Sequence, residues 1–216
     1  MDGYLINNKG IDINKLSKHY LKNKKINNFK GAKFINKPEN VLLLNCDILV
    51  PAATESVINN NNAKKVKAKL IIEAANGPIT YRADQVLNKR GIDILPDIFV
   101  NAGGVVVSYY EWVKNISHIR FGRLQRRFDE QKMRDVMGII EKSTNNPTSP
   151  KLYKKITSGA TEKDLAYSGL EDTMREAFQE ILNEKNKNKK LNFRTAAYAI
   201  ALKKLRKFHD TVGMYS

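Results

Sequence analysis

The sequence has almost no cysteine and no long apolar segment, and each shortage excludes a class of protein. The single cysteine, Cys46, cannot form a disulfide within the chain, and it lies in an apolar run where we expect a buried structural thiol in a reducing compartment. No apolar run approaches the roughly 20 residues that a membrane-spanning helix needs, while the 42% hydrophobic content is ordinary for globular proteins. We therefore expect a globular protein without a membrane partner.

Acidic residues are also scarce: the chain has 22 aspartates and glutamates and 38 lysines and arginines, which gives a formal net charge of +16. Basic chains can bind nucleic acids by releasing counterions from the phosphates. Here the lysines lie in short runs mixed with asparagine, as in 22–25 and 185–190. The sequence contains no zinc-finger spacing, no aromatic RNA-binding signature and no basic recognition helix, so we expect no nucleic-acid partner.

Short branched apolar runs predict a parallel β-sheet. The runs at 46–50, 68–74 and 92–95 each end near proline or glycine, which is typical of strands that are buried on both faces. Between the second and third runs, residues 80–91 predict a helix that Thr80 can cap and Gly91 can end. This order of strand, helix and strand is the repeating unit of parallel α/β folds. Further helices are predicted at 11–23, from 98 through 112, at 125–143, at 161–186 with a Thr161 and Asp164 cap pair, and at 192–209.

Two asparagines follow predicted strands and are candidates for a ligand site. Asn76 and Asn101 each lie just past a strand, at the edge where open α/β sheets bind their ligands. An amide side chain both donates and accepts hydrogen bonds, which suits a carboxamide or a ribose hydroxyl. Asparagine is also a common turn residue, so each one alone favours a structural role. Together, each beside glycine, they favour a site.

Val105 and Ser108 are three positions apart, so they share one face of the helix that is predicted there. The Ser108 hydroxyl beside an apolar surface could hold the end of a small polar substrate. Alternatively, Val105 packs and Ser108 donates to a carbonyl one turn earlier, and the spacing leaves both alternatives open. We expect the neighbouring aromatic residues Tyr109, Tyr110 and Trp112 to be packing residues.

Several segments together carry a resemblance to a known family. They are Gly10-Ile11-Asp12, Cys46–Ala53, Ala75-Asn76-Gly77-Pro78, Asn101–Val105 with Ser108-Tyr109 and Glu111-Trp112, Gly122-Arg123-Leu124, Ser158-Gly159-Ala160, Ser168-Gly169-Leu170 and Arg194–Tyr198. Over essentially all 216 residues the chain resembles the C-terminal half of the hexameric glutamate dehydrogenases, in particular the antenna-bearing animal and protist type within the Glu/Leu/Phe/Val dehydrogenases.

The resemblance implies an α/β fold with an incomplete Rossmann-like, doubly wound parallel sheet that lacks its first βαβ unit. Residues 1–114 would form this partial dinucleotide-binding domain. Residues 115–160 would form an antenna-like protrusion, and residues 161–216 would form a pivot helix and a C-terminal helix that packs on the Rossmann part. Loss of the first strand would leave an apolar sheet edge unpaired.

The resemblance also implies an activity, the NAD- or NADP-linked reversible oxidative deamination of L-glutamate to 2-oxoglutarate and ammonia. Ala52, Ala53, Asn76 and Asn101 would line the nicotinamide and its ribose. Val105 and Ser108 would shape the pocket for the distal carboxylate of glutamate, with Asn76 and Asn101 near the reacting carbon. No metal is implied. The complete enzymes are homo-hexamers, and the mitochondrial matrix is the expected location, although the chain has no targeting segment and a cytoplasmic location fits as well.

Parts of the family's machinery are expected outside this chain. The sequence contains no Gly-x-Gly-x-x-Gly loop for the cofactor phosphates, and the catalytic lysine and aspartate would belong to a separate N-terminal domain. The residue that distinguishes NAD from NADP would also lie upstream. We therefore expect this truncated chain to be inactive alone, and the alternative is a catalytically inactive interaction module.

The chain also departs from the family pattern at positions that the resemblance links to regulation. Tyr167 replaces a histidine of the GTP site, and Glu176 replaces an arginine that would hold ADP, although Lys114 and Asn115 match the ADP region. The resemblance therefore implies weak or absent regulation by GTP and ADP. Ala74 replaces the usual glycine and could crowd the strand end beside Asn76.

Overall fold

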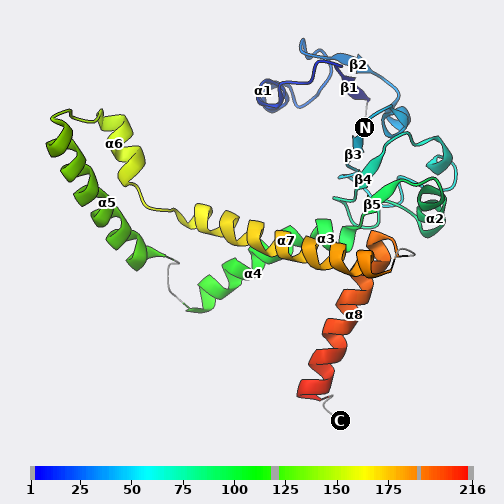
Figure 1. Ribbon diagram of the computed structural model, residues 1–216. Helices are drawn as coiled ribbons and strands as arrows, with labels where there is room; N and C mark the ends of the chain where they lie inside the picture. The colour runs from blue at the N-terminus through cyan, green and yellow to red at the C-terminus, as the bar shows by residue number, and fades with distance from the viewer. Residues whose placement is uncertain (1–2, 118–121, 189–190, 214–216) are drawn as a thin grey trace. The chain divides into compact units, whose positions relative to one another are not determined.

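Residues 3–117, 122–188 and 191–213 are described in the computed structural model, which is shown in Figure 1. The chain divides into two units. The first, called the sheet unit here, comprises Met1–Asp97 and Asn192–Arg194. The second, the helical unit, comprises Ile98–Leu191 and Thr195–Ser216.

The sheet unit is built on three parallel strands in the order β3, β4 and β5, with bounds Ile48–Leu49, Leu70–Ile72 and Asp93–Leu95. Leu49 lies opposite Ile71, and Ile71 lies opposite Ile94. Helix α2 (Tyr81–Lys89) connects β4 to β5. The predicted strand, helix and strand are thereby confirmed, although each strand is shorter than its apolar run.

The core of the sheet unit lies around the central strand β4 and helix α2. Ile71 is fully buried, and α2 turns Ala83 and Leu87 into the same cluster. The edge strand β3 is less buried than β4, because Ile48 on β3 and Val50 directly after it are 54% and 49% exposed. The prediction that all three strands are buried on both faces is therefore wrong for β3, which pairs only with β4 among the described residues.

The beginning of the chain forms a second, antiparallel pair of strands that the sequence did not predict. Strand β1 (Tyr4–Ile6) pairs with β2 (Lys33–Ile35), and the predicted helix α1 (Ile13–Asn23) lies between them in sequence. The predicted strands were recognised from mainly apolar runs of four or more residues, whereas Tyr4–Ile6 and Lys33–Ile35 show neither such a run nor a clear alternation. Two 3-10 helices complete the unit, η1 (Pro38–Leu43) and η2 (Ala63–Lys65).

The helical unit contains the remaining helices. Their bounds are Asp97–Val100 for α3, Ala102–Ser117 for α4, Arg123–Thr144 for α5, Pro150–Thr157 for α6, Glu162–Lys187 for α7 and Phe193–Val212 for α8, with the first residues of α3 and α8 in the sheet unit. The expected cap pair is present, since the Thr161 hydroxyl accepts from the Asp164 amide and the Asp164 carboxylate accepts from the Thr161 amide. Helix α6 was not predicted, and it contacts α5.

Candidate functional site

A hollow of about 410 Å³ lies at the carboxyl ends of strands β3 and β4. Because parallel strands end at the same edge of a sheet, the loops that follow β3 and β4 meet there. The amides of Ala74 and Ala75 both donate to the carbonyl oxygen of Pro51, at 3.1 and 3.0 Å, which ties the two loops together. The lining residues are Ala52, Ala53, Glu55, Ala74, Ala75 and Asn76.

The turn that carries Asn76 is fixed by hydrogen bonds on both sides of Gly77. The Gly77 amide donates to Oδ2 of Asp97 at 2.9 Å, and the Gly77 carbonyl accepts from the Ser56 amide at 2.9 Å. Gly77 has a φ of +52°, a left-handed conformation that favours glycine. Asn76 therefore lies at the wall of the hollow on a constrained backbone.

Beside this turn lies a cluster of charged groups that we call the Arg194 cluster, made of Arg194, Glu73, Asp84 and Asp97. The guanidinium of Arg194 pairs with Oε1 of Glu73 at 2.8 Å, with Oδ1 of Asp84 at 2.9 Å and with Oδ1 of Asp97 at 3.3 Å. The other oxygen of Glu73, Oε2, accepts from the Asp97 amide at 2.9 Å. One cation thus holds three carboxylates near the end of the sheet.

Burial and pairing act on the charges of the Arg194 cluster in opposite directions. Glu73 is 0% exposed, and this burial raises the pKa of its carboxyl although Arg194 opposes the shift. Burial alone would lower the pKa of Arg194, but its carboxylate partners Glu73 and Asp84 outweigh that effect and raise it. We did not predict these roles from the sequence. One feature of the sequence could have indicated the Arg194 cluster. Glu73 stands at the end of a run predicted to be a buried strand, and a buried charge requires a partner of opposite charge.

The other candidate residues belong to the helical unit. Asn101 lies between helices α3 and α4 and is half-buried, so the prediction that it directly follows a strand is wrong. Val105 and Ser108 lie on α4. The hydroxyl of Ser108 donates to the carbonyl oxygen of Gly104, one turn earlier, at 3.0 Å. This agrees with the second of the two alternatives that the spacing left open. Val105 is 73% exposed, so the packing half of that alternative is wrong within this chain.

Ala52, Ala53 and Asn76 thus line one hollow of the sheet unit, whereas Asn101, Val105 and Ser108 belong to the helical unit. The predicted packing of Tyr109 and Trp112 is wrong within this chain, because both rings are exposed, with centroids 5.8 Å apart. Cys46 is half-buried and packs against the core of the sheet unit, and this burial raises the pKa of its thiol, as expected for a structural cysteine.

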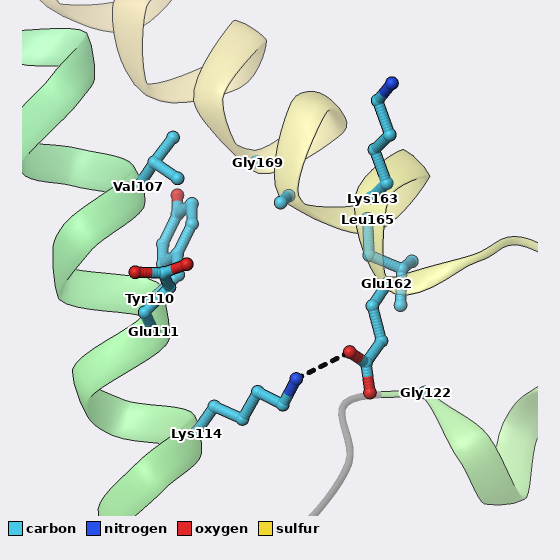
Figure 2. Close-up of a pocket in the computed structure, with 10 residues that line it drawn as sticks. Val107, Tyr110, Glu111, Lys114, Gly122, Glu162, Lys163, Leu165 and Gly169 are labelled. Atoms are coloured by element: carbon cyan, nitrogen blue, oxygen red, sulfur yellow. Dashed lines mark hydrogen bonds and ion pairs between the residues drawn. The ribbon is translucent and has the colours of Figure 1, made fainter.

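The helical unit has a larger hollow of about 520 Å³ between α4 and α7, shown in Figure 2. Lys114 of α4 reaches across it to Glu162 of α7, with 2.6 Å between Nζ and Oε2. The two helices approach closely at Gly169, where an added Cβ would come within 3.0 Å of the Tyr110 hydroxyl oxygen. Lys114 thus has an acidic partner in this structure.

The part of the chain that the structure describes contains neither a metal-ligand cluster nor a membrane-spanning helix. Among residues 3–117, 122–188 and 191–213, no group of three or more histidine, cysteine or acidic side chains is arranged to hold a metal ion. Within the same ranges, no helix has the length and apolarity needed to cross a membrane.

A small parallel sheet with crossover helix α2 defines the chain as an α/β protein, and its hollow lies at the edge where open α/β sheets bind ligands. Comparison with known families is more specific, because residues 1–163 match the model of the Glutamate/Leucine/Phenylalanine/Valine dehydrogenase family. The chain belongs to this family.

Individual relatives agree with this assignment. A probable glutamate dehydrogenase of Sinorhizobium fredii is 41% identical over 205 residues, which cover 94% of this chain and 46% of the relative. A mitochondrial glutamate dehydrogenase of Dictyostelium discoideum is 42% identical over 212 residues, covering 98% of this chain and 42% of the relative. The crystal structure of glutamate dehydrogenase from Peptoniphilus asaccharolyticus matches with a TM-score of 0.63 and 29% identity, over 98% of this chain and 38% of that one. The chain therefore spans less than half the length of the proteins that it matches.

Proposed function

We propose that the chain supplies the nicotinamide side of a glutamate dehydrogenase, which deaminates L-glutamate to 2-oxoglutarate and ammonia with NAD or NADP. The observation that carries the proposal is the hollow at the carboxyl ends of β3 and β4, where Ala52, Ala53 and Asn76 meet. Family membership supports a dehydrogenase, and the similar proteins that bear the name glutamate dehydrogenase support the choice of substrate.

The residues of the hollow fit a nicotinamide cofactor. The small side chains of Ala52, Ala53 and Ala75 leave room for a flat ring, and the Asn76 amide offers both a donor and an acceptor to the carboxamide or ribose. When bound, the cofactor accepts or supplies the hydride, while the chain's own side chains position its nicotinamide end. Ala74 adds a methyl group to the wall beside Asn76, where the family usually has glycine.

In this proposal Asn101, Val105 and Ser108 contribute to the substrate side. The exposed Val105 offers an apolar wall that remains available to a ligand or another part of the enzyme. A carboxylate accepts hydrogen bonds and cannot donate them, so Ser108 must turn its proton away from the Gly104 oxygen to bind the distal carboxylate of glutamate.

The lysine and aspartate that the family uses for proton transfer are not assigned to any residue of this chain. The proposal therefore requires a complete enzyme with a further domain. Family resemblance adds to the proposal that this enzyme is a homo-oligomer of the mitochondrial matrix, with a cytoplasmic location as the alternative.

A specific observation favours the inactive interaction module as second candidate: Val105, Tyr109, Trp112 and Ile116 form an exposed apolar stripe along α4. Such a stripe is typical of a surface that another chain covers.

The proposal is tested on the native protein, captured from its cells with an antibody against residues 160–216. We expect reduction of NAD or NADP that depends on L-glutamate and releases ammonia. Reduction with leucine, phenylalanine or valine but not glutamate would overturn the substrate assignment and retain the family. No reduction with any of the four amino acids would favour the interaction module.

A further inference from the structure

Arg194 lies far along the chain from the sheet, yet it belongs to the sheet unit. The segment Asn192–Arg194 is grouped with Met1–Asp97, and the guanidinium of Arg194 reaches Asp84, which is 110 positions away in sequence. In the Arg194 cluster Asp84 lies on α2, Glu73 directly follows β4, and Asp97 begins α3 two residues after β5. The start of α8 thus brings one positive charge to three carboxylates that lie far from it in sequence.

A continuous series of contacts leads from Arg194 to the proposed cofactor hollow. Nη1 of Arg194 lies 3.3 Å from Oδ1 of Asp97, and the other oxygen of the same carboxylate, Oδ2, accepts from the Gly77 amide at 2.9 Å. Gly77 directly follows Asn76, which lines the hollow. The two oxygens of Asp97 are therefore divided between the cation and the turn.

We propose that Arg194 is a positioning residue that acts through Asp97 to hold the Asn76–Gly77 turn in place for the nicotinamide end of the cofactor. The proposal rests on the proposed function for the identity of the ligand. Its physical basis is the excess of negative charge in the Arg194 cluster, where three carboxylates face one guanidinium. Without that cation, Asp97 is repelled by Glu73 and Asp84, and its carboxylate no longer stays where the Gly77 amide can reach it.

A planar guanidinium is required for this role. Arginine presents its nitrogens in a fixed fork, and here Nε, Nη1 and Nη2 each lie within 3.3 Å of an oxygen of a different carboxylate, whereas a lysine ammonium is a single compact charge. The Arg194→Lys variant therefore keeps the positive charge but cannot reach all three partners. The Asp97→Ala variant removes the acceptor of the Gly77 amide directly and lowers the excess of carboxylates, so it tests the same relationship without adding an unpaired buried charge.

The first measurement is solvent exchange of single backbone amides in the 216-residue chain by NMR. In Arg194→Lys and Asp97→Ala we expect the Gly77 amide to exchange about tenfold faster, which corresponds to the loss of one charge-assisted hydrogen bond. The amide of Ile71, in the buried strand β4, should keep its rate. Unchanged exchange at Gly77 in both variants would overturn the proposal, whatever ligand the protein binds.

Arg90 provides a matched control, because it also uses both terminal nitrogens to hold the sheet unit together. Its Nη1 and Nη2 donate to the carbonyl oxygens of Ala63 and Val66, each at 2.7 Å, and neither bond involves the Asn76–Gly77 turn. Arg90→Lys should therefore lower general stability without a selective change at Gly77. A selective change of the same size in Arg90→Lys would show that Gly77 reports loosening of the whole unit, and would overturn the proposal.

The second measurement is binding of reduced nicotinamide mononucleotide to the same variants. Arg194→Lys and Asp97→Ala should weaken binding about tenfold, whereas Arg90→Lys should leave the dissociation constant unchanged. If Gly77 exchange responds but binding does not, the turn is held by Arg194 without serving the cofactor, and the positioning role is overturned. If the unsubstituted chain binds no nucleotide, the proposed function itself fails. The exchange rate of the Gly77 amide is measured without ligand, so it tests the role of Arg194 separately.

Discussion

The backbone amide of Gly77 donates a hydrogen bond to the carboxylate of Asp97 at 2.9 Å, and this contact joins the loop that follows β4 to the start of α3. The same Asp97 uses its own amide to satisfy Glu73, the fully buried carboxylate at the end of β4. Hydrogen bonds to charged groups are stronger than those between neutral groups. The rim of the sheet is therefore held by polar contacts in addition to apolar packing.

Removal of Arg194 should strongly destabilise the sheet unit. Arg194→Ala leaves the buried Glu73 without its cation, and breaking a buried pair in this way costs about 3–5 kcal/mol. The free energy of unfolding, measured by urea denaturation, checks this value. Arg206→Ala is the control, because Arg206 pairs with Asp210 at an exposed site and should lose about 1 kcal/mol or less. Equal losses of unfolding free energy in Arg194→Ala and Arg206→Ala would show that Arg194 does not stabilise the buried Glu73.

The titration of Glu73 should lower the free energy of unfolding as the pH rises through the pKa that Glu73 has in the folded protein. Its pKa is raised in the folded protein, so the folded state binds a proton more tightly than the unfolded state does. The resulting stabilisation is present below the unfolded pKa and is lost as the pH rises through the folded pKa. Glu73→Gln removes this titration, so the unfolding free energy of the variant minus that of the original chain should increase across the same range. Urea denaturation at a series of pH values measures the difference, and a decrease would contradict the assigned direction.

Substitution of two glycines should shift stability in opposite directions. Gly77→Ala forces a side chain into a left-handed conformation and should cost about 1–2 kcal/mol, although no atom lies within 4 Å of the added Cβ. Gly104→Ala, inside helix α4 and also in open space, should stabilise the protein by about 0.5–1 kcal/mol. Thermal unfolding of the two variants distinguishes them, and a stabilising Gly77→Ala would contradict the described turn.

Two threonines at helix N-termini should respond differently to substitution. Thr161 forms a reciprocal capping box with Asp164, so Thr161→Ala should cost about 1 kcal/mol. Thr80 occupies the same position before α2 but makes no capping hydrogen bond, and its hydroxyl oxygen is buried without a partner. Thr80→Ala should therefore be neutral or stabilising. Chemical denaturation of both variants checks the contrast, which would fail if Thr80→Ala cost as much as Thr161→Ala.

Local patterns were sufficient to predict the elements that depend on nearby residues. The apolar runs around Ile48, Ile71 and Ile94 are strands, and the Thr161 and Asp164 pair marks the start of α7. The three-residue strands β1 and β2 were missed because a pairing between Leu5 and Phe34 leaves no periodic signal in either short segment. The exposure of Val50 was missed because it depends on which neighbours the strand has.

The candidate site was predictable only in part. The position of Asn76 beside a strand end follows from the order of apolar runs and turns, and its place in the hollow with Ala52 agrees with that reasoning. The Arg194 cluster was not predictable in this way, since Arg194 and Asp84 are 110 positions apart and only the folded chain brings them together. The roles of Asn101, Val105 and Ser108 stay predictions.

Binding of the nicotinamide end at this sheet edge is tested by an NMR titration of the 216-residue chain with reduced nicotinamide mononucleotide. We expect shifts at the amides of Ala52, Ala53 and Asn76 and about tenfold weaker binding in Asn76→Ala, which corresponds to about 1.4 kcal/mol. Asn60→Ala, which changes an exposed asparagine of the same unit outside this hollow, should bind normally. An unperturbed hollow at saturating nucleotide, or equal effects of the two substitutions, would contradict the claim that this sheet edge binds the nicotinamide end of the cofactor.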